Sequence, residues 1–161
     1  MVKIIYHSEL EKSHTKDIIG VKSISWHYTF EQHLEWMNKN LLPNDIHFLV
    51  YDDNGLLMSY LNLVNVSVFI NNEKISILGI GNVCSRYKGK GDGNKLMIEL
   101  NDYLFKNHLK GLLFCKESLI SFYEKYNWKI IPNVCSDKNI YTMIFNFTKE
   151  FKNLNYSDRN F

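Results

Sequence analysis

The middle of the chain alternates apolar runs with short polar turns. The apolar run 46–51 is followed by Asp-Asp-Asn-Gly at 52–55, and Asn-Gly between two such runs is a strong signal of a β-hairpin. The long run 56–70 leads through a second turn, 71–73, into the run 74–83. This pattern predicts three consecutive antiparallel strands joined by tight turns.

Two helices are predicted before these strands. Residues 8–26 form a mixed stretch that we interpret as a helix with a loosely defined end. Thr29 stands three residues before Gln32, which is the spacing of a capping box, and this pair opens the next helix. Pro43 and the two residues after it end that helix. Its apolar stripe would comprise Phe30, His33, Leu34 and Met37.

Beyond residue 93 the apolar residues first follow a spacing of three and four. In 94–108 this spacing predicts an amphipathic helix. The chain is predicted to begin with a strand at 2–7. After the helix at 94–108 we expect a strand at 111–114, a further helix at 118–126, and strands at 128–131 and 140–147. The polar segment 148–161 is expected to be a frayed, flexible tail.

The order of these elements fixes the expected fold class. A strand–helix–strand crossover leaves its two strands either parallel or separated by another strand, so the sheet must be mixed. We therefore expect an α/β fold, called α+β by some conventions. A length of 161 residues suits a single domain spanning 1–161.

Composition and charge exclude several classes of protein. The net charge of +2, from 19 basic and 17 acidic residues, gives no support to nucleic-acid binding. No run approaches the roughly 18 apolar residues of a membrane span. Residues 1–9 do not resemble a signal peptide, so we expect a cytoplasmic protein without a membrane partner.

The three cysteines, Cys84, Cys115 and Cys135, are widely spaced and form no CxxC pair. Neither a metal site nor a disulfide framework is predicted from them. Cys84 and Cys115 lie in apolar, strand-like runs, so we expect both to be buried small apolar residues.

The segment 82–96 carries the candidate chemistry. It places three glycines and several lysines between a predicted strand and a predicted helix. Glycines let backbone N–H groups turn toward one point, and the N-terminus of the following helix favours a phosphate. The segment therefore predicts a pyrophosphate cradle. Its residues are Lys88, Gly89, Lys90, Gly91, Asp92, Gly93 and Asn94, with Lys95 as a further cation.

Two common phosphate loops do not fit this segment. A Walker loop needs Lys followed by Ser or Thr after its last glycine, and the segment lacks that pair. A dinucleotide-binding loop follows the first strand of its fold, whereas this loop follows the fourth predicted strand.

The loop resembles the acyl-CoA loop of the GNAT acetyltransferases, which joins the fourth strand to the third helix. That motif is Arg or Gln, two residues, Gly, one residue, then Gly or Ala. Arg86-x-x-Gly89-x-Gly91 matches it literally. Lys88-x-x-Gly91-x-Gly93 has Lys at the first position, but it also aligns the residues on either side with the family's usual surroundings. We prefer this second register.

A second segment carries the same resemblance. Phe-Tyr-Glu-Lys at 122–125 matches the start of the family's Phe-Tyr-Glu-Lys-x-Gly-Phe pattern, and Asn127-Trp128 stands in place of Gly-Phe. Asn also tolerates the left-handed backbone conformation that Gly adopts. Lys116 occupies a position where the family often has Asn. The two segments together span roughly 76–131.

The resemblance implies a GNAT-like mixed, mostly antiparallel central sheet flanked by helices, and an N-acetyltransferase that uses acetyl-CoA and no metal. It implies that the backbone at Val83 and Cys84 faces the thioester, and that Lys88 to Asn94 hold the diphosphate. Asp92 replaces a commonly hydrophobic residue there and could cap the helix.

Tyr123 matches the family's general acid, which protonates the departing thiolate. The spacing alone favours a packing role for this side chain, since it shares an apolar helix face with Leu119 and Phe122. The resemblance favours a catalytic or thiol-binding role. The general base is not identified, because Gly79 stands where related enzymes often carry Glu.

The acceptor is expected to be a small-molecule amine, with an amino sugar as one candidate. His27, Gly79 and Gly81 are weak candidates for contacting it. Trp26, Tyr28 and Trp36 could stack on a sugar, but they are expected mainly to fill the core. A non-catalytic acyl-CoA-binding module is the alternative function. A homodimer is conceivable for so aromatic a chain, but nothing in the sequence fixes an interface.

Overall fold

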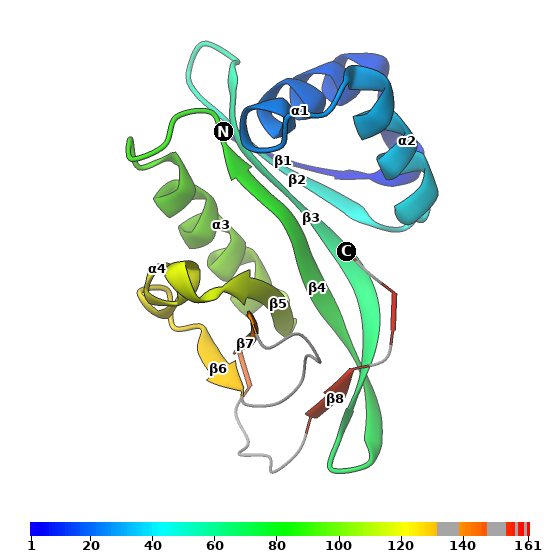
Figure 1. Cartoon of the computed structure of the whole chain (residues 1–161), viewed down its shortest axis with the longest axis vertical. Coiled ribbons are helices and arrows are strands. Elements are labelled where there is room, and N and C mark those ends of the chain that lie inside the picture. The colour runs from blue at the N-terminus through cyan, green and yellow to red at the C-terminus, as the bar shows by residue number, and fades with distance from the viewer. Residues whose placement is uncertain (132–138, 148–153, 157, 160) are drawn as a thin grey trace. The chain divides into compact units, whose positions relative to one another are not determined.

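The computed structural model describes residues 1–131, 139–147, 154–156, 158–159 and 161 (Figure 1). In chain order the elements are β1 (Val2–Tyr6), the 3₁₀ helix η1 (His7–Glu9), α1 (Lys12–Ser25), α2 (Phe30–Asn40), β2 (Ile46–Tyr51), β3 (Leu57–Ile70), β4 (Glu73–Ser85), α3 (Asp92–Lys106), β5 (Gly111–Lys116), the 3₁₀ helix η2 (Glu117–Leu119), α4 (Ile120–Glu124), β6 (Lys129–Ile131), β7 (Ile140–Phe145) and β8 (Leu154–Tyr156). The fold is the expected mixed α/β type, with a mostly antiparallel open sheet flanked by helices.

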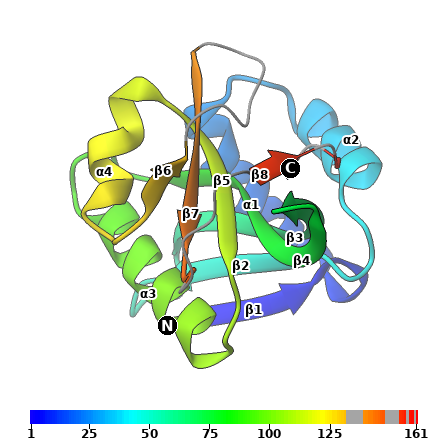
Figure 2. The ribbon, with the colours of Figure 1, turned by 90° about the horizontal axis from the view of Figure 1, so that it is seen from below.

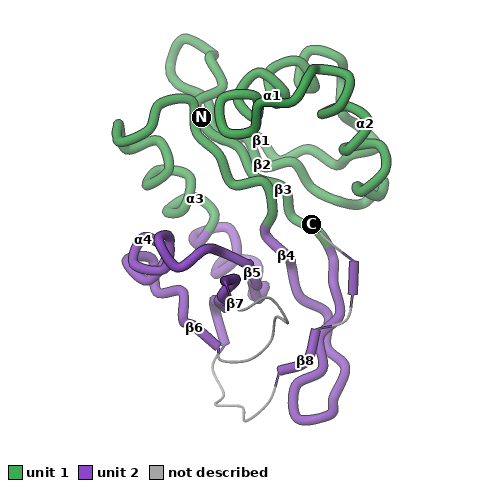
Figure 3. Tube along the Cα trace, viewed as in Figure 1, with its two compact units in different colours: residues 1–64, 81–100, 161 green, residues 65–80, 101–160 purple. Residues whose placement is uncertain are grey.

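The chain divides into two compact units (Figure 3). The first unit comprises residues 1–64, 81–100 and 161, and the second comprises 65–80 and the described part of 101–160. Three long elements, β3, β4 and α3, contribute residues to both units. Among the described residues, no helix is both long and apolar enough to cross a membrane.

The first unit is built on antiparallel pairs of β1 with β2 and of β2 with β3. Gly55 adopts a positive φ of 79° in the turn before β3, which confirms the predicted Asn-Gly hairpin. Helices α1 and α2 pack against each other. The capping box of α2 is present, because Thr29 Oγ1 accepts from the Gln32 backbone and the Gln32 side chain accepts from the Thr29 backbone.

The second unit contains the parallel pair and the remaining antiparallel pairs. β4 runs parallel to β5 from Leu78–Gly111 to Ile80–Leu113, and α3 provides the crossover between these two strands. β7 is antiparallel to both β5 and β6, and Figure 2 shows it between them. The strand order is β1-β2-β3-β4-β5-β7-β6, with β8 beside β3. Thus one crossover joins parallel neighbours and the other joins separated strands, as the element order predicted.

Two details differ from the sequence prediction. The predicted helix at 8–26 divides into η1 and α1. Phe30 is exposed instead of lying on the buried stripe of α2, where His33 and Met37 are buried.

The predicted frayed tail contains the strand β8. It pairs with β3 at Val68 to Ile70, beyond the residues of β3 that pair with β2, and the ring of Tyr156 packs edge-on against Phe114. So short a polar strand leaves no periodic signal in the sequence, because it is held by an available strand edge. The other tail residues 148–153, 157 and 160, and Cys135, lie outside the described residues.

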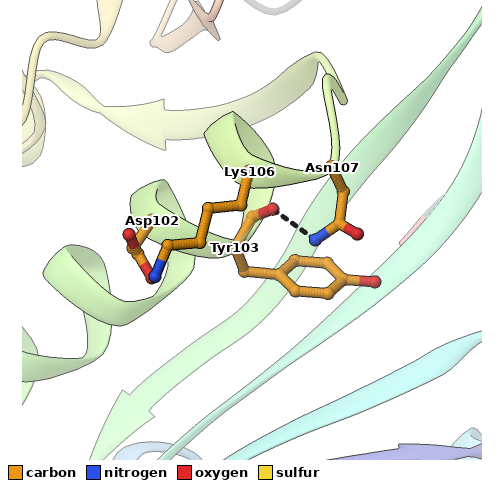
Figure 4. A network of polar contacts seen from close by, with 4 residues as sticks. All are labelled: Asp102, Tyr103, Lys106 and Asn107. Atoms are coloured by element: carbon orange, nitrogen blue, oxygen red, sulfur yellow. Dashed lines mark hydrogen bonds and ion pairs between the residues drawn. The ribbon is translucent and has the colours of Figure 1, made fainter.

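The C-terminal part of α3 carries polar contacts on its surface (Figure 4). Lys106 Nζ lies 2.7 Å from a carboxylate oxygen of Asp102, and both side chains are more than half exposed. Asn107 donates a hydrogen bond to the carbonyl oxygen of Tyr103. Exposed pairs of this kind contribute little to stability, so we assign this cluster no function.

Candidate active site

The glycine loop leaves β4 and enters α3 within the first unit. Its start is fixed by Arg86, whose backbone N–H donates to the carbonyl of Met58 at 2.7 Å and whose Nε donates to that of Leu57 at 2.8 Å. The Arg86 guanidinium is therefore engaged by a protein carbonyl. This contact supports the second register, in which Lys88 and not Arg86 takes the first position of the motif.

Two of the loop glycines have backbone conformations that other residues rarely adopt. Gly89 has a φ of 74° and Gly91 a φ of 93°, and a Cβ on either would meet no atom within 4 Å. Glycine is therefore required here by the turn and not by a crowded neighbour. The open space above both glycines leaves their backbone accessible to a bulky anion.

The charge around the loop favours an anion, with one exception. Lys88, Lys90 and Lys95 are exposed, and the 15-residue helix α3 begins directly after Gly91. Asp92 lies in the first turn of α3, and its Oδ2 is buried without a hydrogen-bond partner among the described residues. The loop thus fits a diphosphate, and Asp92 is the group that opposes it.

Strand β4 contains a left-handed residue just before the residues expected to face the thioester. Asn82 has a φ of 52° in the middle of the strand, and its side-chain amide donates to Oδ1 of Asn62 at 2.6 Å. A left-handed residue inside a strand re-aims the backbone that follows it. Val83 and Cys84 come directly after this bend.

Burial keeps the Cys84 side chain in its thiol form. The side chain is buried and free, and burial raises the pKa of its thiol to about 12. Cys115 in β5 is likewise buried and free, with its thiol pKa raised to about 11 by burial. Both residues confirm the expectation of buried small apolar side chains.

A cavity of about 480 Å³ opens in the first unit, next to α1, α2 and β4. Trp26, Tyr28 and Trp36 line it, which corrects the expectation that these rings mainly fill the core, and Tyr28 is 60% exposed. The wall residues come from α1, from α2, from the segment between these two helices, from β4 and from Phe161. Among the described residues, the lining comprises Lys22, Trp26, Tyr28, Gln32, His33, Trp36, Asn82 and Phe161.

Of the weak acceptor candidates, none lines this cavity. His27 is exposed and is absent from the lining. Gly81 instead permits a close backbone approach, because a Cβ there would lie 2.5 Å from the carbonyl carbon of Phe161. Gly79 lies in the second unit, where it pairs with Leu112 of β5.

The residue that sequence reasoning missed is Lys22. Its side chain is 2% exposed, and its Nζ lies 4.3 Å from the centre of the Trp36 ring. Burial lowers the pKa of this ammonium to about 8. A signal was present, since Lys22 follows Ile18 by four positions and Ile19 by three, on the buried face of α1.

His33 combines a structural role with a place on the cavity wall. Its Nε2 lies 3.1 Å from the carbonyl oxygen of Trp26, and its ring meets that of Tyr28 edge-on. Burial lowers the pKa of His33, and the nearby Lys22 lowers it further. The ring is therefore neutral at physiological pH and donates one hydrogen bond to hold the end of α1.

A buried polar chain lies deeper in the first unit. His47 contacts His7 through Nε2 and the hydroxyl of Tyr60 through Nδ1, each at 2.9 Å. His47 is fully buried, and this burial, together with nearby His7, Lys22 and His14, lowers its pKa to about 3. The chain is thus made of neutral groups.

Tyr123 belongs to the second unit. The side chain is 5% exposed, and its ring lies against those of Phe122 and Trp128. Burial, and then nearby Cys115, raise the pKa of its phenol. The hydroxyl therefore keeps its proton at neutral pH, but it is a weaker acid than an exposed tyrosine.

The comparisons with known proteins decide the family. A family model described as an acetyltransferase (GNAT) domain matches residues 7–131, which is most of the chain. The chain belongs to the GNAT acetyltransferase family. It is accordingly an acetyl-CoA-dependent acyltransferase.

Solved GNAT structures share the fold at low sequence identity. An acyl-CoA N-acyltransferase from Pseudomonas aeruginosa has a TM-score of 0.66 and 16% identity, covering 89% of this chain and 98% of that one. Campylobacter jejuni N-acetyltransferase PseH with acetyl coenzyme A has a TM-score of 0.61 and 20% identity, covering 90% and 98%. An aminoglycoside 6'-N-acetyltransferase with coenzyme A has a TM-score of 0.62 and 14% identity, covering 89% and 96%. A search of curated proteins gave no match.

Proposed function

We propose that this GNAT acyltransferase transfers an acetyl group from acetyl-CoA to the amine of a small molecule, by direct attack of the amine on the thioester in a ternary complex. The observation that carries the proposal is the glycine loop, which presents open backbone and lysines at the start of α3 directly after a bent strand. The structural neighbours that contain coenzyme A or acetyl coenzyme A support this donor.

The chain supplies a separate group for each need of the reaction. Lys88 and the loop through Asn94 would hold the diphosphate by charge and backbone N–H groups. The backbone N–H groups at Val83 and Cys84 would polarise the thioester carbonyl. Tyr123 would return a proton to the departing thiolate. We propose that residues 1–161 act together as one catalytic domain.

The acceptor is proposed to enter the cavity beside α1 and α2, which lies in the same unit as the glycine loop. Three aromatic rings in its lining could stack on a sugar or another ring. One structural neighbour is named as acting on an aminoglycoside, so an amino sugar stays a candidate acceptor. His27, Gly79 and Gly81 are not supported by contacts with this cavity.

A non-catalytic acyl-CoA-binding module is the second candidate function. It is favoured by Gly79, which stands where related enzymes often carry a carboxylate base, and by the raised phenol pKa of Tyr123. The Tyr123→Phe variant separates the two. We expect it to lower kcat by at least about tenfold while acetyl-CoA affinity stays the same. An unchanged kcat would remove Tyr123 from the mechanism.

The first experiment is a calorimetric titration of the protein with acetyl-CoA and with free CoA, using ATP and NAD as controls. Micromolar binding of the two CoA species alone is expected. A panel of amines is then tested for release of the free CoA thiol. Binding of acetyl-CoA without any amine-dependent release would favour the binding module, and no binding would overturn the proposed function.

A pair of loop variants locates the donor site. Gly91→Ala and Gly91→Glu carry the same backbone strain at a φ of 93°, but only the second adds bulk and a negative charge. We expect Gly91→Glu to weaken acetyl-CoA binding by more than about 100-fold and Gly91→Ala to weaken it much less. Gly20→Glu, at an exposed position of α1, controls for the change in net charge. Equal affinities of all three variants would place the donor elsewhere.

A further inference from the structure

Asn82 stands where the cavity of the first unit meets the strand segment that is expected to face the thioester. Its side chain lines the cavity, and Val83 follows it directly in β4. The φ of 52° at Asn82 turns the backbone at this point of the strand. An amine that contacts Asn82 from the cavity would therefore lie next to the backbone at Val83.

One half of the Asn82 amide is held by a buried neighbour. Its Nδ2 donates to Oδ1 of Asn62 at 2.6 Å, and Asn62 is 0% exposed in β3, where it pairs with His47 of β2. A partner that is fully buried in the middle of a sheet has a fixed position. The contact therefore restricts rotation of the Asn82 amide, as a supporting hydrogen bond does for a side chain that binds a ligand.

The other half of the Asn82 amide is a hydrogen-bond acceptor at the cavity. Among the described residues no group donates to Asn82 Oδ1, and this oxygen is not one of their buried atoms without a partner. It therefore reaches open space, and the open space that Asn82 lines is the cavity. An amide oxygen has two lone pairs and accepts N–H groups such as those of an amine.

Several other side chains in the lining are poorly suited to receive an amine beside β4. Trp26 and Trp36 can only donate hydrogen bonds through their rings. Gln32 Oε1 already accepts a hydrogen bond in the capping box of α2. Among the described lining residues, Asn82 alone belongs to β4, the strand that carries Gly79 where related enzymes often have Glu. The acceptor oxygen nearest in sequence to the expected thioester position is thus that of Asn82.

We propose that Asn82 contacts the acceptor substrate, with its side-chain oxygen accepting a hydrogen bond from the amine so that the nitrogen lone pair points to the thioester carbonyl. This inference rests on the proposed function, because it assigns the cavity to the acceptor and the backbone at Val83 to the thioester. The neutral amine nitrogen bonds to the carbonyl carbon, the C–S bond breaks, one amine proton passes to water, and the thiolate takes up a proton, with Tyr123 as its proposed donor. An amide is not a base, so Asn82 orients the amine without taking its proton.

The first variant removes the amide without straining the backbone, since glycine adopts a φ of 52° freely. Acetylation of glucosamine, benzylamine and methylamine is measured by release of the CoA thiol, and acetyl-CoA binding by calorimetry. We expect Asn82→Gly to lower kcat by at least about tenfold while the affinity for acetyl-CoA changes by less than about twofold. Asn72→Gly makes the same exchange at a φ of 68° in the exposed turn between β3 and β4 and should leave kcat unchanged.

The second variant separates contact with the amine from a structural role. Asn82→Asp keeps an acceptor oxygen at this position and adds a negative charge, so it can also bind the protonated amine. We expect it to retain kcat within about threefold of the unmodified protein. As the pH is lowered from about 8.5 to about 6.5, KM for benzylamine should rise in the unmodified protein, where the neutral amine becomes scarcer, and much less in Asn82→Asp. A residue that only joined β3 to β4 would leave the pH dependence of KM unchanged.

The outcomes distinguish this inference from the proposed function. If acetyl-CoA binds and Asn82→Gly acetylates amines as fast as the unmodified protein, the inference is overturned while the acetyltransferase stands. It is likewise overturned if Asn82→Asp loses as much kcat as Asn82→Gly and KM keeps its pH dependence, or if none of the amines tested releases the CoA thiol. Failure of acetyl-CoA itself to bind is the result that removes the proposed function.

Discussion

The two units of the chain differ in what they bury. Seven polar or charged side chains are buried among the described residues, and six of them lie in the first unit, while Thr142 lies in the second. The six are Lys22, His33, Asp45, His47, Ser59 and Asn62. The second unit packs around large apolar groups instead, with Trp128 stacked on Phe145 and hydrogen bonded to Asn101 through its Nε1.

The difference indicates that the first unit contains side chains whose burial lowers the stability of the fold. Buried polar groups are costly unless they are hydrogen bonded, and in the first unit Ser59 Oγ and Asn62 Nδ2 have no partner among the described residues. The candidate acceptor cavity and the glycine loop lie in this same unit. Functional sites commonly carry such unfavourable groups, and a well-packed region elsewhere compensates for them.

Acid should affect the first unit before the second. His7, His33 and His47 have lowered pKa values in the folded state, so the unfolded chain binds protons first as the pH falls below 6.5. Stability is therefore full above pH 6.5 and declines toward the folded pKa of about 3 for His47. His47 alone should lower the free energy of unfolding by about 2–3 kcal/mol at pH 4.5.

Hydrogen exchange at pH 6.5 and 4.5, corrected for the intrinsic pH dependence of exchange, checks this comparison. Amides of β2 should lose protection relative to amides of β5 and β7. This pH window lies above the lowered pKa of Asp158 in the second unit, whose own stabilising effect is lost only at lower pH. An equal loss of protection in both units would contradict the prediction that acid destabilises the first unit before the second.

Added volume should be tolerated poorly in the second unit. A Cβ at Gly111 would lie 2.6 Å from Cη2 of Trp128 and 3.1 Å from Cδ1 of both Ile80 and Leu104. We expect Gly111→Ala to lower the free energy of unfolding by about 2 kcal/mol in chemical denaturation.

Gly20→Ala is the matched control for that measurement. A Cβ at Gly20 meets nothing within 4 Å in α1, so alanine there should stabilise the chain by up to about 1 kcal/mol through helix propensity. Equal effects of the two substitutions would show that the side chains around Gly111 can move to accept a Cβ.

Removing the buried charge of the first unit should stabilise the protein. Lys22→Met keeps the side-chain length and apolar contacts while deleting an ammonium that burial disfavours. We expect the free energy of unfolding at pH 7 to rise by about 1 kcal/mol, net of the lost contact with Trp36. Thermal unfolding measures it, with Lys16→Met expected to have no effect. A lower stability of Lys22→Met would mean that this charge supports the fold.

The smallest effect is expected at Asn127 in the second unit. This residue has a φ of 62° and stands where the family pattern has Gly. Asn127→Ala should lower the free energy of unfolding by about 1 kcal/mol, because a Cβ without a polar side chain disfavours the left-handed region. Asn127→Gly should leave the free energy of unfolding nearly unchanged. Denaturant unfolding of both variants tests this, and a large loss in the glycine variant would show that the Asn side chain itself is needed.

Much of the fold could be predicted because it depends on short-range signals. The Thr29–Gln32 capping box forms as its spacing predicted. Asn71 and Asn72 both adopt positive φ in the two-residue turn between β3 and β4, as such hairpins require. The strand β8 could not be predicted, because its three residues are held by the free edge of β3 and not by any pattern of their own.

The candidate site likewise has parts that the sequence predicted and parts that it did not. The glycine loop and Tyr123 were named from the sequence, and their roles stay proposals. The bend at Asn82 was not predicted, because Gly79 and Gly81 were interpreted only as room for a substrate or a close backbone approach and not as signs of a bend in the strand. The cavity was missed because its aromatic residues have the spacing of core residues, and only packing decides whether a ring meets another side chain or open space.

The sequence by itself determined which residues turn, cap and alternate, because these properties depend on a few neighbouring φ and ψ angles and on the period of apolar positions. It also determined the family, through the loop at 86–93 and the segment at 122–128. Only the tertiary structure decided that Lys22 is buried at the wall of a cavity. Burial and electrostatic surroundings are set by residues distant in the chain, here Trp36 and Asn82, and no local pattern encodes them.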